Sequence, residues 1–119
     1  MNRKQKIGHK GESCACQYLC NIGYNIIQQN FKCNQGEIDI IAYDISTKEI
    51  VFIEVKTRTN FNYGIPSESV TRTKIKHIKK CINYYIHLNN LYENYLRIDV
   101  IEIVYYKNKY KVNHLKNVI

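Results

Sequence analysis

The sequence contains no run of apolar residues that approaches the roughly 20 needed for a membrane-spanning helix. Its start, Met1-Asn2-Arg3-Lys4-Gln5-Lys6, does not lead into the apolar segment of a signal peptide. It also has no internal repeat, no low-complexity tract and no linker-like stretch. These absences argue against a membrane protein and a repeat protein, and we expect a cytoplasmic protein with one domain over residues 1–119.

The cysteines and histidines lack the spacings typical of metal sites. No paired C-x-x-C motif is present, and an odd number of cysteines argues against a disulfide framework as well as a zinc site. We therefore expect reduced and mostly buried thiols. The five cysteines are Cys14, Cys16, Cys20, Cys33 and Cys81. The histidines, which show no ligand spacing, are His9, His77, His87 and His114.

The composition is basic. There are 18 Lys and Arg residues against 10 Asp and Glu, which gives a formal net charge of +8. Such an excess attracts polyanions, although charge alone does not say which. The eleven tyrosines are more typical of core and strand positions than of stacking platforms, and Tyr63 is only a weak candidate for a base contact.

Hydrophobic periodicity predicts the order α-β-β-β-α-β, with a further short strand at the end. Apolar residues at helical spacing predict a first helix over residues 5–21, which Gly23 ends, and a second over residues 71–90 with Thr71 as its N-cap. The apolar face of the first helix comprises Ile7, Gly11, Cys14, Ala15, Tyr18, Leu19 and Ile22. The predicted strands are residues 24–31, 37–43, 49–57, 95–105 and 110–113.

The predicted third strand carries charge where apolar side chains are expected. Alternation along a strand places Glu54 and Lys56 on one face with Phe52, and Val51, Ile53 and Val55 on the other. A carboxylate and an ammonium group on an apolar strand lose hydration at a cost. They therefore form either a tight structural pair or a functional site.

Three carboxylates fit one site. Asp39 lies on the second strand, next to Glu54 on the third, and Glu12 lies at the margin of the apolar face of the first helix. Two carboxylates about 4 Å apart repel by roughly 4 kcal/mol at an effective dielectric constant of 20, and a single Lys56 does not neutralise three. Hard oxygen ligands suit Mg²⁺ or Mn²⁺ better than zinc. Lys56 would then orient or deprotonate water, or stabilise charge on a phosphate.

Each of these residues also has a simpler interpretation. Asp39 and Lys56 in isolation are as well explained by a buried ion pair. Glu12 near a helix start is more often a surface residue that interacts favourably with the helix dipole. Glu37 at a strand entrance is expected to be solvated or to support the other acids. Arg97 and Asp99 share a strand face and are expected to pair, without a chemical role.

An acidic residue followed on the next strand by Glu-x-Lys, here Asp39 with Glu54-Val55-Lys56, resembles the PD-(D/E)xK nuclease superfamily. Nearly the whole chain also resembles the YraN-like bacterial family. The segments that carry this second resemblance are Gly8 through Glu12, Gly23-Tyr24, Asn30-Phe31, Gly36-Glu37-Ile38-Asp39, Phe52-Ile53-Glu54-Val55-Lys56-Thr57-Arg58, Gly64-Ile65-Pro66 and Val70-Thr71-x-x-Lys74. Cys33-Asn34-Gln35 departs from the family by standing in place of a more basic loop.

The resemblance implies a restriction-endonuclease-like α/β fold, with a mixed central sheet flanked by helices. It also implies metal ligation by Asp39, Glu54 and the Val55 carbonyl, with Glu12 as the extra acid of the kind seen in Holliday-junction resolvases. Catalysis would involve these acids and Lys56. The expected cofactor is Mg²⁺ or Mn²⁺.

The expected partner is nucleic acid, in the first place DNA, with no membrane partner, and the sequence leaves a homodimer open. The basic residues expected at the phosphates are Arg58, Arg72 and above all Lys74. We therefore expect an endonuclease that acts on structured or branched DNA. The alternatives are a non-catalytic nucleic-acid-binding or adaptor protein of the same fold, and a domain whose partner is another protein.

Overall fold

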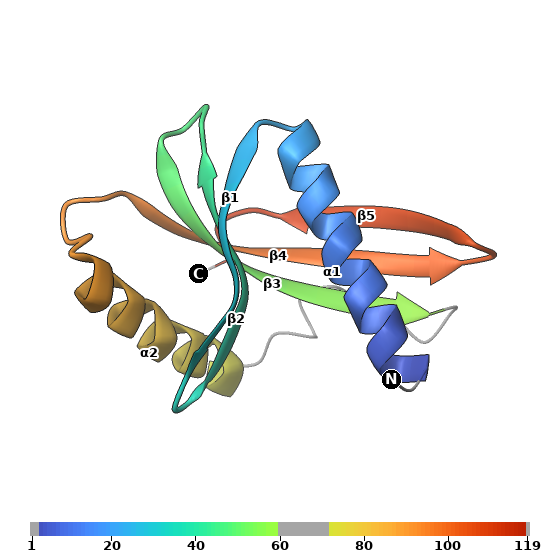
Figure 1. Ribbon diagram of the computed structural model, residues 1–119, viewed down its shortest axis with the longest axis horizontal. Coiled ribbons are helices and arrows are strands. Elements are labelled where there is room, and N and C mark those ends of the chain that lie inside the picture. Colours follow the sequence, from blue (N-terminus) through green and yellow to red (C-terminus); the bar gives the residue numbers. More distant parts are fainter. Residues whose placement is uncertain (1–2, 60–71, 119) are drawn as a thin grey trace.

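The computed structural model describes residues 3–59 and 72–118 of the chain. Within these ranges two helices and five strands follow one another in the predicted order (Figure 1). Their bounds are α1 Arg3–Asn21, β1 Tyr24–Cys33, β2 Gly36–Asp44, β3 Glu49–Thr59, α2 Arg72–Asn89, β4 Leu96–Tyr106 and β5 Lys109–Leu115. The order α-β-β-β-α-β and the additional last strand are thus confirmed.

The strands form one mixed sheet in the spatial order β1-β2-β3-β4-β5. Strands β3 and β4 are parallel, and the other neighbouring pairs are antiparallel. The parallel pair requires a crossover, and α2 lies in that connection, whereas the antiparallel strands follow one another through short turns. The turn from β4 to β5 consists of Lys107 and Asn108, whose φ values of 49° and 62° match a two-residue hairpin loop.

The two helices cover opposite faces of the sheet (Figure 1). Ala15 and Leu19 of α1 pack in one buried cluster with Val51 and Ile53 of β3. Phe52 belongs to the other cluster, which contains the buried side of α2. The alternation predicted for β3 is therefore confirmed. The apolar residues of α2 in this second cluster are Ile78, Cys81, Ile82, Tyr85 and Ile86.

Helix α1 packs closely on β3 because Gly11 has no side chain. A Cβ atom at this position would collide with the Thr57 side chain. Gly23, with a φ value of 92°, adopts the left-handed conformation typical of a helix stop, as predicted. The assignment of Ile22 to the apolar face of this helix is wrong. Ile22 is 44% exposed, because the helix ends at Asn21 and the chain turns away from the core.

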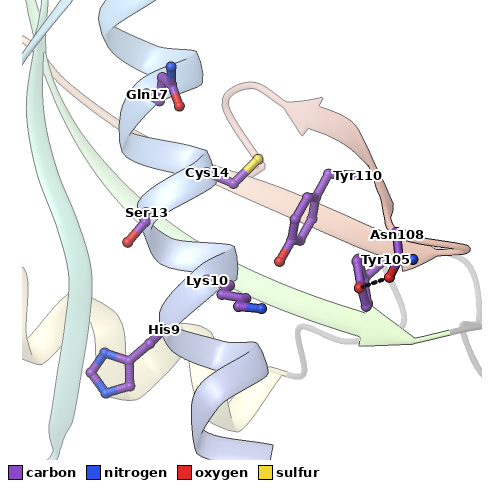
Figure 2. A pocket seen from close by; sticks show the side chains of 8 residues that line it. All are labelled: His9, Lys10, Ser13, Cys14, Gln17, Tyr105, Asn108 and Tyr110. Carbon is purple, nitrogen blue, oxygen red and sulfur yellow. Dashed lines mark hydrogen bonds between the residues drawn. The ribbon is translucent and has the colours of Figure 1, made fainter.

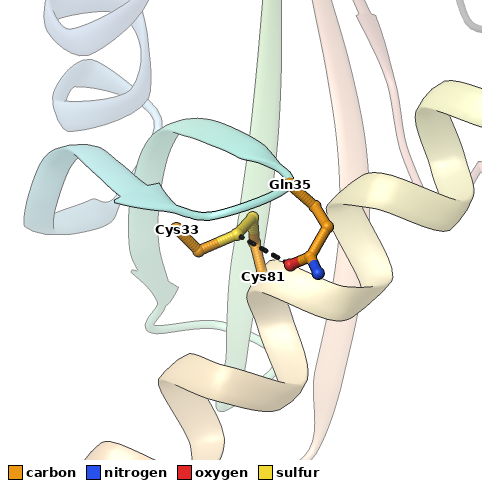
Figure 3. The surroundings of a disulfide bond; sticks show 3 residues. All are labelled: Cys33, Gln35 and Cys81. Atoms are coloured by element: carbon orange, nitrogen blue, oxygen red, sulfur yellow. Dashed lines mark hydrogen bonds between the residues drawn. A yellow bond between two sulfur atoms is a disulfide. The ribbon is translucent and has the colours of Figure 1, made fainter.

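The prediction of reduced, mostly buried cysteines is also wrong. Cys33, the last residue of β1, forms a disulfide with Cys81 of α2, 48 residues further along the chain (Figure 3). Of the three free cysteines among the described residues, Cys14 and Cys16 are half-buried and Cys20 is exposed. The two cysteines come together only because the end of the β1–β2 hairpin packs near α2 in the tertiary structure. The local spacing of the cysteines in the sequence therefore gave no sign of the bond.

The other fold predictions fall partly outside the described ranges. The N-cap at Thr71, the loop before it and the candidate base contact Tyr63 lie outside the described residues. In the described ranges, no helix combines the length and the apolar character needed to cross a membrane.

Candidate active site at the opening between two strands

Two of the three predicted acids, Asp39 and Glu54, lie where β2 and β3 stop pairing. The register between these strands runs from Asp44 opposite Glu49 to Ile40 opposite Ile53. Asp39 and Glu54 are the next residues on each strand. Beyond the last pair, the Asp39 carboxylate accepts a hydrogen bond from the backbone N–H of Val55, with 2.7 Å between Oδ2 and N. At this opening, the side-chain carboxylate of Asp39 thus accepts the hydrogen bond that a backbone carbonyl of β2 would accept in a paired sheet.

Glu54 binds two ammonium groups. Its side chain is only 8% exposed, and its Oε1 lies 2.6 Å from Nζ of Lys74 and 3.4 Å from Nζ of Lys56. Lys56 lies two residues along β3 on the same face, as predicted, and Lys74 comes from the first turn of α2. The structure therefore pairs Lys56 with Glu54, whereas the simpler interpretation paired it with Asp39.

The two lysines have opposite pKa shifts. Burial and the neighbouring Lys74 lower the pKa of Lys56, and Glu54 opposes this only in part. Burial also acts to lower the pKa of Lys74, but its hydrogen bond and charge interaction with Glu54 raise that pKa overall. Lys74 thus keeps its proton more firmly than an ordinary lysine, and Lys56 gives up its proton more readily.

Asp39 is the most perturbed acid of the site. Burial raises its pKa to about 7, and the nearby charges of Glu54, Glu12 and Glu37 act in the same direction. The hydrogen bond from Val55 opposes the shift. A carboxyl group with this pKa is destabilised in its charged form by burial and by the neighbouring negative charges.

Glu12 lies on the α1 side of this group. Its side chain is half-buried, and burial, followed by the charges of Glu37 and Glu54, raises its pKa. Glu12 and Glu37 line a cavity of about 390 Å³ together with His9 and residues of β1. Glu37, which was expected to be solvated or to support the other acids, is half-buried here, and its role stays a prediction.

The arrangement fits a cation held by few protein ligands. Among residues 3–59 and 72–118, no three His, Cys, Asp or Glu side chains lie close enough together to hold a metal ion. Mg²⁺ is often held by only one or two carboxylates together with water and phosphate oxygens. Asp39 and Glu54 supply two such carboxylates of hard oxygen character. The role of Glu12 as a third ligand stays a prediction.

Glu102 is a buried acid that the sequence analysis missed. It lies on β4 opposite Lys56 of β3, and it is 1% exposed. Neither of its carboxylate oxygens has a hydrogen-bond partner, and Nε of Arg58 lies 3.8 Å from Oε2. A charged residue within the apolar run Ile98–Tyr105 is the same signal that singled out Glu54, and it could have identified Glu102.

The predicted phosphate contacts are placed at different depths. Lys74 binds Glu54 directly, and the half-buried Arg58 lies beside Glu102. Arg72 is exposed at the start of α2. The start of α2 thus meets β3 through Lys74 and Glu54.

A second buried polar group is structural. The Arg97 guanidinium donates two hydrogen bonds to Asp99, at 2.8 and 3.0 Å, and also binds Asp44 at 3.2 Å and Glu49 at 2.7 Å. The predicted pair of Arg97 and Asp99 is confirmed. His114 lies 2.7 Å from Asp99, so this network fastens β5 to β4 and to the β2–β3 turn.

The fold and site define a mixed α/β protein with an acidic and lysine-bearing opening at one end of its central strands. The pattern of the family described as "Uncharacterised protein family UPF0102" matches residues 11–103. The chain belongs to this family, as the resemblance to the YraN-like family predicted. The family description names no reaction.

Full-length relatives support the assignment. A UPF0102 protein of Clostridium novyi (strain NT) is 43% identical over 118 residues, which cover 98% of this chain and 97% of the relative. One of Carboxydothermus hydrogenoformans is 44% identical over 119 residues, 100% of this chain and 98% of the relative. One of Caldicellulosiruptor bescii is 46% identical over 120 residues, with 98% of each chain covered.

Proposed function

We propose that this protein is a metal-dependent endonuclease that hydrolyses phosphodiester bonds in structured or branched DNA. The observation that carries the proposal is the joint position of Asp39, Glu54 and Lys56 at the opening between β2 and β3. There, burial and neighbouring carboxylates raise the pKa of Asp39 to about 7. The basic excess of the chain, +8, supports an anionic substrate.

Mg²⁺ or Mn²⁺ would be held by the carboxylates of Asp39 and Glu54 and by the Val55 carbonyl. The N–H of Val55 reaches Asp39, and within a strand the N–H and C=O of one residue point to the same edge. The Val55 carbonyl therefore faces the same opening. A bound divalent cation would stabilise negative charge on the phosphate and lower the pKa of a water molecule.

The two lysines suit different tasks. Because its pKa is lowered, Lys56 can orient a water molecule and accept its proton more readily than an exposed lysine can. Lys74 stays charged and lies at the surface end of the site, where it can contact a substrate phosphate while it holds Glu54 in place. Glu12, on α1, would act as an additional acid.

A cleavage assay tests the proposal. Purified protein is incubated with branched DNA and Mg²⁺ or Mn²⁺, and Asp39→Ala, Glu54→Ala and Lys56→Ala should each abolish cleavage, because such residues act as a unit. Exposed residues of the same types provide matched controls, and Glu93→Ala and Lys79→Ala should cleave like the wild type. Equal cleavage by all variants would show a contaminant and contradict the proposal.

A second candidate is a non-catalytic nucleic-acid-binding or adaptor protein of the same fold. The observation that favours it is the neutralisation of Glu54 by two lysines, at 2.6 and 3.4 Å. This alternative predicts salt-dependent DNA binding with no cleavage at any metal concentration. Absence of all DNA and RNA binding at low salt would favour a protein partner.

A further inference from the structure

A pocket of about 580 Å³ lies between α1 and the β4–β5 hairpin (Figure 2). Its volume is in the range of sites for small ligands. Asp39, Glu54 and Lys56 do not line it, so it is separate from the proposed active site. None of the described residues that line it is acidic.

The hairpin side of the pocket is an ordered pair of aromatic rings. Tyr105 of β4 lies opposite Tyr110 of β5, and the ring centroids are 4.9 Å apart at an angle of 36°. The Tyr105 hydroxyl donates a hydrogen bond to Asn108 Oδ1 at 2.7 Å. The two-residue loop and this bond hold the rings in place, which reduces the entropy cost of stacking a ligand on them.

The helix side supplies a less polar wall and a charge. Cys14 and Lys10 project from α1 toward Tyr110, whose ring remains 37% exposed (Figure 2). Burial raises the pKa of the Cys14 thiol, so this group is neutral at physiological pH. Gln17 and Asn108 add amide groups at the rim. A flat, partly polar ring system therefore finds a stacking surface and hydrogen-bonding partners in one pocket.

The surroundings favour an anion. Lys10 is the lysine among the described residues that line the pocket. Lys109 and Lys111 alternate with Tyr110 along β5 and lie on the other face of the sheet, and Nζ of Lys107 lies 5.2 Å from the centroid of the Tyr106 ring. Lys10 projects from α1 toward the two tyrosines, whereas the side chain of His9, which also lines the pocket, points away from them (Figure 2). Aromatic side chains interleaved with basic ones are the combination with which proteins bind unpaired nucleotides, since the base stacks and the phosphate meets positive charge.

The pocket shares one lining residue with the cavity beside the predicted acids. His9 lines both this pocket and the 390 Å³ cavity that contains Glu12 and Glu37. Tyr105 lies one position beyond Val104, which is opposite Arg58 on β3. The pocket and the cavity of Glu12 and Glu37 therefore both lie along α1.

We propose that the pocket binds an unpaired nucleotide of a DNA strand next to the cleavage site, so that the substrate is DNA with a single-stranded branch. This inference rests on the proposed function for its substrate. Bases inside a duplex are covered on both faces by their neighbours and have no free face for Tyr110. The pocket thus distinguishes a branch from an intact duplex.

Binding measured in chelator tests this inference independently of cleavage. Fluorescence anisotropy with a single-stranded oligonucleotide and with a blunt duplex of the same sequence should show tighter binding of the single strand. Tyr110→Leu should weaken single-strand binding by roughly fivefold or more, as expected for the loss of one stacked base, and leave duplex binding unchanged. Tyr110→Phe keeps the ring and should bind like the wild type. Tyr95→Leu, at the other end of β4, is the matched control.

Thiol labelling locates the bound strand. The single strand should protect Cys14 from a maleimide reagent and leave the exposed Cys20 reactive, and the duplex should protect neither. Equal binding of both DNAs together with an unchanged Tyr110→Leu variant would overturn the inference, as would equal protection of Cys14 by the single strand and by the duplex. Single-strand binding at the pocket without metal-dependent cleavage would overturn only the proposed function.

Discussion

The carboxylate of Asp39 and the backbone N–H of Val55 are joined by a hydrogen bond of 2.7 Å across the opening between β2 and β3. The position of the acid is therefore fixed by the backbone of the strand that carries Glu54 and Lys56. Its charge is nevertheless poorly compensated, because burial and three other carboxylates raise its pKa. The hydrogen bond sets the geometry of the site, and burial and the surrounding acids disfavour the charged form of Asp39.

The first prediction concerns Asp39→Asn in metal-free buffer. The asparagine oxygen can still accept the Val55 N–H, and the substitution removes a buried negative charge. The pKa of Asp39 in the folded state, about 7, lies above its ordinary value of 3.8, so the folded protein binds this proton more tightly than the unfolded chain does. The wild type should therefore lose stability as the pH rises from about 4 to about 7, and Asp39→Asn should lose less.

Urea unfolding across this pH range, in chelator, measures the effect. Near neutral pH the variant should be as stable as the wild type or more stable. A loss of about 3–5 kcal/mol in Asp39→Asn would instead indicate that Asp39 neutralises a buried cation such as Lys56.

Arg97 should contribute strongly to stability. The substitution Arg97→Met leaves Asp44 and Asp99 buried without their guanidinium partner, which is expected to cost about 3–5 kcal/mol. Urea unfolding measures this cost, and Lys48→Met at an exposed position is the control. The double variant Arg97→Met with Asp99→Asn should recover part of the loss, and no recovery would contradict the assigned pairing.

Reduction of the Cys33–Cys81 disulfide should destabilise the fold. The bond closes a loop over a separation of 48 residues, for which chain entropy predicts about 4 kcal/mol. Cys33 Sγ also lies 3.8 Å from Gln35 Oε1 (Figure 3). A disulfide sulfur carries no proton to donate, so this contact becomes a hydrogen bond only after reduction and offsets little of the loss.

Thermal melts with and without a phosphine reductant measure this difference. The double variant Cys33→Ser with Cys81→Ala should melt like the reduced wild type and show no response to the reductant. A wild type that melts at the same temperature in both states would show that the bond does not form in solution.

DNA binding should depend on salt through Arg58 and Lys74. If each contacts a phosphate, Arg58→Ala with Lys74→Ala should reduce the slope of log Kd against log salt concentration by about 1.8, or roughly 0.9 for each contact. Lys79→Ala with Lys80→Ala, at exposed positions of α2, is the matched control. An unchanged slope in the first double variant would place the nucleic-acid surface elsewhere.

The sequence predicted the elements well because their signals are local. Periodicity located each helix and strand to within about three residues. In α2 and β3, for example, the apolar residues recur at regular helical and strand spacing. The shared face of Glu54 and Lys56 followed from strand alternation alone.

Tertiary relationships account for what the sequence did not predict. The disulfide joins the end of a hairpin to a helix, and the bond between Lys74 and Glu54 depends on where α2 begins relative to β3. The burial of Glu102 depends on its pairing with β3 in parallel register. None of these relationships has a fixed spacing along the chain.

The most direct measurement of the central claim, that Asp39 and Glu54 form a divalent-cation site, is the thermal stability of the protein with chelator and with Mn²⁺. A ligand that binds only the folded state should stabilise the wild type by about 2.7 kcal/mol at a concentration of 100 times its Kd. Asp39→Asn should show almost no response to Mn²⁺, and Glu93→Gln, an exposed control, should respond like the wild type. A wild type that does not respond to Mn²⁺, or an Asp39→Asn variant that responds equally, would contradict the assignment of these carboxylates as a metal site.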